Sequence, residues 1–246
     1  MDLGVAGRCY VVSGGSRGLG RATAEVLLAE GADVVIGARS TPTSLGATHV
    51  HTVQCDLAEP DAAQRLVDAA LEHHGRVDGA LISVGGPPIG SAMGLSDDDW
   101  RSSFETVFLG SVRLARTVAA VLPDSGAICF VLSGSAKSPI GGLAASNGLR
   151  PGLAMLTKQF ADELGPQNIR VNAVLPGRIA TDRVAQLDEA TGNVDAARRG
   201  HEASIPLRRY GEPVELGRVA AFLLSPAASY VTGSLLAVDG GGLRAL

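Results

Sequence analysis

The chain has 246 residues, of which 46% are hydrophobic, and its 21 basic and 25 acidic side chains give a formal net charge of −4. That length suits a single α/β domain with a large core. The charge is nearly balanced and has no long runs, which argues against nucleic acid or a membrane surface as a partner.

The local composition excludes two further classes of protein. No apolar run approaches the roughly 20 residues of a membrane helix, and the first residues lack a secretory-signal pattern, so we expect a cytoplasmic protein. Cys9, Cys55 and Cys129 lie far apart in apolar, strand-like stretches. That placement indicates buried thiols, with no metal site and no disulfide.

The first apolar run of the chain breaks into a glycine-rich turn at residues 13–20. Gly14 permits a tight turn, Gly18 allows the backbone to approach a pyrophosphate, and Gly20 allows the next helix to pack closely on a sheet. An amphipathic segment follows at once, so the free N–H groups of its first turn would face the anion. This pattern is typical of a dinucleotide-binding site, although ordinary strand-to-helix turns also use glycine freely.

The second predicted strand, at residues 33–39, ends where dinucleotide-binding sites contact the adenosine ribose. An acidic residue there would favour NAD, whereas Arg39 and Ser40 offer a cation and a hydroxyl that suit a 2′-phosphate. Arg17, inside the glycine turn, would add a second cation. We therefore predict NADP(H) as the cofactor; the alternative is that both arginines are solvated surface charges.

The rest of the chain alternates strands with helices. After a polar loop at 42–47, strands are predicted at 49–55, 77–82, 127–132, 169–175 and 234–238, and helices at 61–74, 96–121, 146–164 and 213–224. This alternation predicts one doubly wound Rossmann-type α/β domain, with a seven-stranded, mainly parallel sheet and helices on both faces. A polar, Arg- and Ala-rich insert at 178–209 interrupts it, and we expect a substrate lid over about residues 178–212.

Four motifs together give the chain a resemblance to the short-chain dehydrogenase/reductase (SDR) family, in the branch that holds the 3-oxoacyl-carrier-protein reductases. These motifs are residues 13–20, Asp56-Leu57, residues 176–181 and residues 231–241. The resemblance covers nearly the whole chain. It implies an oxidoreductase that acts on a small molecule, with a nicotinamide cofactor and usually a homotetramer. The broad apolar stripe of the predicted helix at 96–121 agrees with a homo-oligomer.

The glycine turn, the end of the second strand and the resemblance together define an expected cofactor site. Its residues are Gly14, Ser16, Arg17, Gly18, Leu19, Gly20, Arg39, Ser40, Asp56, Leu57, Gly85, Pro176, Gly177, Ile179 and Thr181. Asp56 would accept a hydrogen bond from the adenine amine. The resemblance implies that Ile179 and Thr181 touch the carboxamide and phosphate of the nicotinamide half.

The catalytic residues of the family are only partly matched. The expected Tyr-x-x-x-Lys motif falls on Ser146 to Arg150, and the expected catalytic asparagine falls on Val107. The Asn-Asn-Ala-Gly turn of the family reads Ile-Ser-Val-Gly at 82–85. Of the usual set, only the serine remains, as Ser133.

Without the tyrosine, the expected site has no obvious acid to protonate a reduced oxygen. Serine titrates far too high for that role, and arginine cannot relay protons as lysine can. We expect Ser133, Ser146 and Arg150 to form a polar catalytic pocket in which the arginine holds a ribose, a carboxylate or a developing oxyanion. His201 and Lys137 are candidate proton sources, although each is more typical of a solvent-exposed side chain.

Several functions remain open from the sequence. An NADPH-dependent reductase of quinone-like acceptors needs no built-in acid, because its product is a stabilised oxyanion; ordinary ketone reduction would need water as a slow proton donor. The main alternative is an NADP-binding regulatory or structural protein without reductase activity, and non-redox chemistry of the lyase type is a further one. The mixed charges of the insert select neither an acidic nor a neutral substrate.

Overall fold

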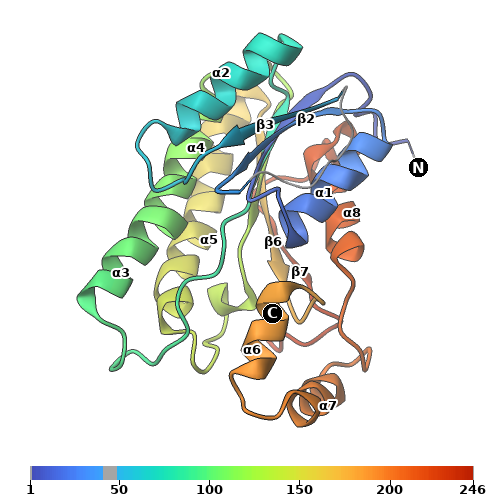
Figure 1. Cartoon of the computed structure of the whole chain (residues 1–246). Helices are drawn as coiled ribbons and strands as arrows, with labels where there is room; N and C mark the ends of the chain where they lie inside the picture. The colour runs from blue at the N-terminus through green and yellow to red at the C-terminus, as the bar shows by residue number, and fades with distance from the viewer. Residues whose placement is uncertain (1, 41–48, 246) are drawn as a thin grey trace.

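The computed structural model describes residues 2–40 and 49–245, so the whole of the predicted polar loop at 42–47 lies outside the described residues (Figure 1). Seven strands form one sheet in the order β3-β2-β1-β4-β5-β6-β7, and every adjacent pair is parallel. The strands are Cys9–Ser13 (β1), Asp33–Ala38 (β2), Val50–Gln54 (β3), Gly79–Ile82 (β4), Ala127–Val131 (β5), Arg170–Pro176 (β6) and Leu235–Val238 (β7). The predicted doubly wound fold is confirmed.

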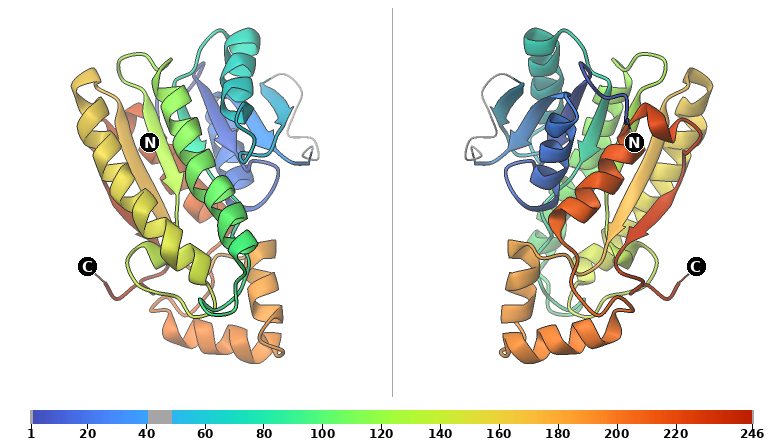
Figure 2. Two further views of the ribbon diagram at one scale, coloured as in Figure 1. Left: turned by 90° about the vertical axis from the view of Figure 1, so that its left-hand side faces the viewer. Right: turned by 90° about the vertical axis from the view of Figure 1, so that its right-hand side faces the viewer.

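Helices cover both faces of the sheet, with α1 and α8 on one face and α2, α4 and α5 on the other (Figure 2). The helices are Gly18–Ala29 (α1), Ala62–His74 (α2), Asp97–Ser103 (α3), Gly110–Ala119 (α4), Ala144–Leu164 (α5), Asp182–Glu189 (α6), Val194–Ser204 (α7) and Pro213–Leu224 (α8). Within the described ranges, no helix is both long enough and apolar enough to cross a membrane.

The core consists of two apolar clusters, one against each face of the sheet. Strands β1, β4 and β5 are buried along their whole length, which explains their continuous apolar sequence. Cys9, Cys55 and Cys129 are buried and unpaired, as predicted. Burial raises the pKa of the Cys9 and Cys129 thiols to about 12, so neither is a reactive thiolate near neutral pH.

The helix predicted at 96–121 is not continuous, because a π-helical segment at Phe104–Leu109 separates α3 from α4. Val107 lies buried within this segment, and its carbonyl accepts a hydrogen bond from the Ser111 hydroxyl at 2.7 Å. A π-helical turn re-aims the side chains on either side of it. This segment packs against α5, where a Cβ at Gly152 would lie 2.8 Å from the Phe108 ring.

The polar insert folds as α6 and α7 at the end of the molecule beyond the carboxyl ends of the strands (Figure 1). Its centre is a buried carboxylate, Asp188, which accepts hydrogen bonds from Arg178 at 2.9 Å and from the Tyr210 hydroxyl at 3.0 Å. The insert therefore has a polar centre of its own in place of an apolar core, which explains why its sequence has so few apolar residues.

Candidate active site

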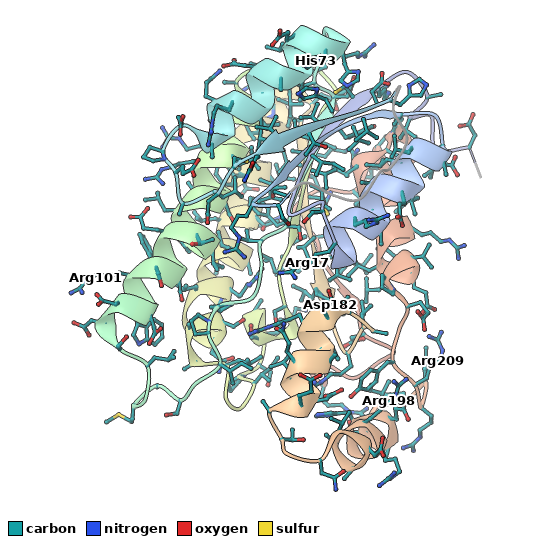
Figure 3. The ribbon with its side chains drawn as sticks, viewed as in Figure 1. Arg17, His73, Arg101, Asp182, Arg198 and Arg209 are labelled. Carbon is teal, nitrogen blue, oxygen red and sulfur yellow. The ribbon has the colours of Figure 1, made fainter. Side chains whose placement is uncertain are left out.

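The turn between β1 and α1 has the geometry of a phosphate-binding loop. Gly14 has a φ of +62°, and a Cβ there would lie 2.6 Å from the Ser83 carbonyl oxygen. A Cβ at Gly20 would lie 2.5 Å from the Gly14 oxygen. Arg17 precedes α1 without a side-chain capping bond, so the first N–H groups of this helix are left for an anion. Figure 3 shows Arg17 at the end of α1 that faces α6.

The residues expected to bind the adenosine half lie together beyond β2 and β3. An Arg39 nitrogen lies 3.9 Å from a carboxylate oxygen of Asp56, and the carbonyl of Arg39 accepts a hydrogen bond from Gln54. Arg39 and Ser40 are exposed, whereas Leu57 is buried. An exposed cation held this loosely is available to a phosphate group.

The segment that follows β6 comes back to the phosphate-binding loop. Ile179 is buried and pairs with Gly211 through an isolated bridge, and Thr181 caps α6 by accepting a hydrogen bond from Val184. The Thr181 methyl group lies 3.8 Å from the Cβ position of Gly18. Two predicted cofactor segments from distant parts of the chain are thus adjacent.

The remaining predicted cofactor residues surround the same edge of the sheet. Pro176 and Gly177 end β6, where a Cβ at Gly177 would lie 2.5 Å from Asp239. Ser16 and Leu19 are half-buried in the phosphate-binding loop, and Gly85 is exposed in the turn after β4. All of them stay predicted ligands of the cofactor.

Of the three predicted catalytic residues, Ser146 and Arg150 lie one turn apart on α5, and both are buried. The Ser146 hydroxyl is 2.9 Å from the hydroxyl of Ser135, a residue that the sequence analysis did not select. Ser133 is half-buried and accepts a hydrogen bond from the Ser135 amide at 3.1 Å. The short 3₁₀ turn Gly134–Ala136 therefore directs Ser135, and not Ser133, towards the helix. The family spacing points to Ser133, and no signal in the sequence indicates that Ser135 makes the contact with Ser146.

Arg150 is a buried cation with few partners. One of its nitrogens donates to the carbonyl of Val131, the last residue of β5, and its Nε has no partner among the described residues. No described carboxylate forms an ion pair with it. Burial lowers the pKa of Arg150 to about 10, because desolvation disfavours the charged form.

The two candidate proton sources are not brought to these residues. Lys137 is exposed. His201 lies in the insert, where its Nε2 is 4.0 Å from Asp188 and its ring faces Tyr210. Burial, together with the charge of Arg178, lowers the pKa of His201. No group of three or more described His, Cys, Asp or Glu side chains is arranged to hold a metal ion.

Comparison with known proteins identifies the family. The profile described as enoyl-(acyl carrier protein) reductase matches residues 14–242. The chain is 36% identical to an uncharacterized oxidoreductase of Mycobacterium tuberculosis, over 94% of this chain and 90% of that protein. It is 32% identical to the 3-oxoacyl-[acyl-carrier-protein] reductase FabG of Chlamydia pneumoniae, over 98% of this chain and 99% of that protein. The chain belongs to the short-chain dehydrogenase/reductase family.

A solved structure of another SDR shares the whole fold. L-sorbose reductase of Gluconobacter frateurii, determined with NADPH and L-sorbose, superposes with a TM-score of 0.92 at 30% identity and covers 100% of both chains. The relatives named here are oxidoreductases, and the chain is an SDR oxidoreductase.

Proposed function

We propose that the protein is an NADPH-dependent oxidoreductase that transfers hydride to a carbonyl or quinone-like acceptor without an acidic tyrosine. One observation carries the proposal: Arg150 is buried beside the end of β5 with an unpartnered Nε and no described carboxylate nearby. A preorganised cation in such a place can stabilise negative charge on a reduced oxygen. The alternative is an NADP-binding SDR protein without reductase activity.

The residues of the phosphate-binding loop and of β2 fit a phosphorylated dinucleotide. Gly14 and Gly20 leave space that a Cβ would fill, and the uncapped first turn of α1 offers N–H groups to a pyrophosphate. Arg17 and Arg39 are exposed cations that suit a 2′-phosphate. NADPH supplies the hydride when it is bound.

In the proposed mechanism, the protein binds the acceptor oxygen and stabilises its charge. The Ser133 hydroxyl group donates a hydrogen bond to that oxygen, since its own oxygen already accepts one from the Ser135 amide. Arg150 stabilises the negative charge that develops there. Water then delivers the proton. This slow step favours quinones as acceptors, because their reduced oxygen is a stabilised phenolate.

We also propose that residues 178–212 act as a lid, and that the chain forms a homo-oligomer through the apolar face at Phe104, a residue that is 42% exposed.

Isotope-labelled cofactor tests the proposed function. We would follow the oxidation of 4R- and 4S-deuterated NADPH with β-ketoacyl thioesters, cyclic ketones and polycyclic quinones under anaerobic conditions. We expect a primary isotope effect with one deuterated form and with one class of acceptor. A ketone product would retain deuterium on carbon, whereas a hydroquinone would lose it to water. Tight NADPH binding without oxidation by any acceptor would favour the non-reductase alternative.

Cofactor preference gives a prediction at Arg39. The Arg39→Asp variant should raise the KM for NADPH by about tenfold or more and lower the KM for NADH, because a carboxylate repels the 2′-phosphate and accepts from a ribose hydroxyl. Arg101→Asp is a matched control, since the Arg101 side chain is 71% exposed and that of Arg39 is 70% exposed. Steady-state kinetics with both cofactors checks this. An equal increase in the KM values for NADPH and NADH would contradict the assignment of Arg39 to the 2′-phosphate.

The two serines after β5 give a second prediction. We expect Ser133→Ala to lower kcat about 100-fold, the effect of removing one oxyanion donor. Ser135→Ala should lower it about tenfold or less, because Ser135 acts through Ser146. Single-turnover rates with saturating NADPH separate these effects from cofactor binding. A larger decrease of kcat in Ser135→Ala than in Ser133→Ala would mean that Ser135 donates the hydrogen bond to the acceptor oxygen.

A further inference from the structure

Arg183, in the first turn of α6, reaches across to the turn that follows β4. Its Nη2 donates to the carbonyl of Pro87 at 2.7 Å. A Cβ at Gly86 would lie 2.7 Å from the Arg183 Nε and 3.0 Å from its Cζ. The guanidinium therefore lies directly on the backbone of this turn, and glycine at position 86 makes the close approach possible.

The charge of Arg183 is not neutralised by the described part of the chain. Three other arginines of the insert each form an ion pair with a carboxylate within 4.0 Å: Arg178, Arg198 and Arg209. Arg183 forms none with any described residue; its hydrogen bond goes to a backbone carbonyl. Arg183 is half-buried, and this partial loss of solvation lowers its pKa. A guanidinium has five N–H donors, so most of those of Arg183 remain available to an oxyanion.

The adjacent Asp182 does not supply the missing charge. Its side chain is exposed and lines a hollow of about 240 Å³ with Gly18 and Arg21, on the side of α6 that faces α1 (Figure 3). Successive helical residues point about 100° apart. The two charges of the first turn of α6 therefore face different surroundings.

The turn that Arg183 contacts also leads to the helix that holds Ser146 and Arg150. Gly90 pairs with the loop before α5: its amide donates to Gly142 at 2.8 Å, and its carbonyl accepts from Ala144 at 3.1 Å. Ala144 is the first residue of α5 and lies two positions before Ser146. The segment 86–90 therefore connects Arg183, at one end, to the helix of Arg150, at the other. These two arginines lack a carboxylate partner among the described residues.

We propose that Arg183 binds an anionic group of the substrate, so that the acceptor is a carbonyl compound that also carries a carboxylate. The inference rests on the proposed reductase function and adds a substrate class to it. A partly desolvated, unpaired arginine binds a carboxylate strongly and often by two parallel hydrogen bonds. The pyrophosphate of the cofactor is the other oxyanion that could reach this side chain, and the experiment distinguishes the two.

The test compares an acid with its ester. We would measure NADPH oxidation with 4-oxocyclohexanecarboxylate and with its methyl ester, which share the ketone and differ in charge. The natural protein should have a kcat/KM about tenfold or more higher for the acid. Arg183→Gln should remove this preference by lowering the value for the acid only, and Arg183→Lys should restore part of it. Arg199→Gln, which removes an exposed arginine of the insert, is the control.

A second variant tests the geometry without removing the charge. Gly86→Ala should also reduce the preference for the acid, because the added methyl group displaces the guanidinium from the turn. The proposal would be overturned if either variant lowered kcat/KM equally for the acid and the ester. It would also be overturned if Arg183→Gln raised the KM for NADPH, which would assign Arg183 to the pyrophosphate of the cofactor.

A binding measurement separates this proposal from the proposed function. Cyclohexanecarboxylate has no carbonyl group to reduce, so calorimetry with the NADPH-saturated protein reports the anion site alone. We expect its Kd to increase about tenfold in Arg183→Gln and to stay unchanged in Arg199→Gln. Binding that depends on Arg183 without any turnover would support the anion site and contradict the reductase. Binding that ignores Arg183 would contradict the anion site, whatever the activity.

Discussion

The Arg150→Met variant should unfold at a higher temperature than the natural protein and yet reduce its acceptor about 100-fold more slowly. Arg150 is buried, has an unpartnered Nε and donates to the carbonyl of Val131 alone among the described residues. Methionine fills a similar volume without a charge to desolvate. Activity should fall because the acceptor oxygen loses the group that stabilises its negative charge.

The sign of the stability change follows from the pKa of Arg150. Burial lowers this pKa to about 10 in the folded protein, below that of an arginine in water. The unfolded chain therefore binds the proton more tightly, and the buried charge favours unfolding at every pH below about 10. Replacement of buried ion pairs by apolar side chains ranges from neutral to a stabilisation of about 1–4 kcal/mol; we expect a gain in this range for the unpaired Arg150, of which the loss of one hydrogen bond offsets about 1 kcal/mol. Thermal unfolding at pH 7 measures the difference.

Arg170→Met is the matched control for this prediction. Arg170 is also buried, but its guanidinium donates to the carbonyls of Leu223, Leu224, Ser225 and Val231. The same substitution there leaves several buried carbonyls without a donor and should destabilise the fold by about 2 kcal/mol or more. If Arg150→Met is destabilised as strongly as Arg170→Met, Arg150 contributes to folding and is not held in an unfavourable state for function.

The strands and the glycine-rich turn between β1 and α1 could be predicted because their physical causes are local. Buried parallel strands need continuous apolar runs, so β5, predicted at 127–132, was visible in the sequence to within one residue, and the apolar run before the glycine-rich turn indicated β1. The glycines of the phosphate-binding loop are required by backbone contacts that any such turn makes. By contrast, the π-helical segment Phe104–Leu109 depends on packing against α5, which composition does not record.

The candidate site was only partly predictable for a related reason. The family spacing selects Ser133, whereas the contact with Ser146 is made by Ser135, through the direction of a single 3₁₀ turn. The charges of the insert are balanced in number, so the sequence indicated no preference for an anionic substrate. Which arginines are paired depends on helix geometry: Arg198 finds Glu202 four residues away, and Arg183 faces a backbone turn. The lack of a carboxylate partner for the half-buried Arg183 is visible only in the folded chain.

Restoring the tyrosine and lysine of the family should change the preferred acceptor from a quinone to a ketone. In the double variant Ser146→Tyr/Arg150→Lys, kcat/KM for a cyclic ketone should rise about 100-fold or more, because a tyrosine beside a lysine ammonium can act as the missing general acid. Quinone reduction should fall in the same variant, because it loses the Arg150 guanidinium. The two residues are one turn apart on α5, so both new side chains start from the same face of the helix.

The variant Ser146→Phe/Arg150→Lys is the control, since it adds the ring without the hydroxyl group. The kcat/KM for the ketone should increase only in the variant with tyrosine. Its pH profile should then show an additional ionisation near the pKa of the tyrosine hydroxyl group. An equal increase with phenylalanine would mean that the ring acts by shaping the pocket. If the tyrosine variant is folded and binds NADPH but reduces the ketone no faster, the missing acid does not explain the weak reduction of ketones. The pocket around Ser135 and position 146 would then exclude ketones by itself.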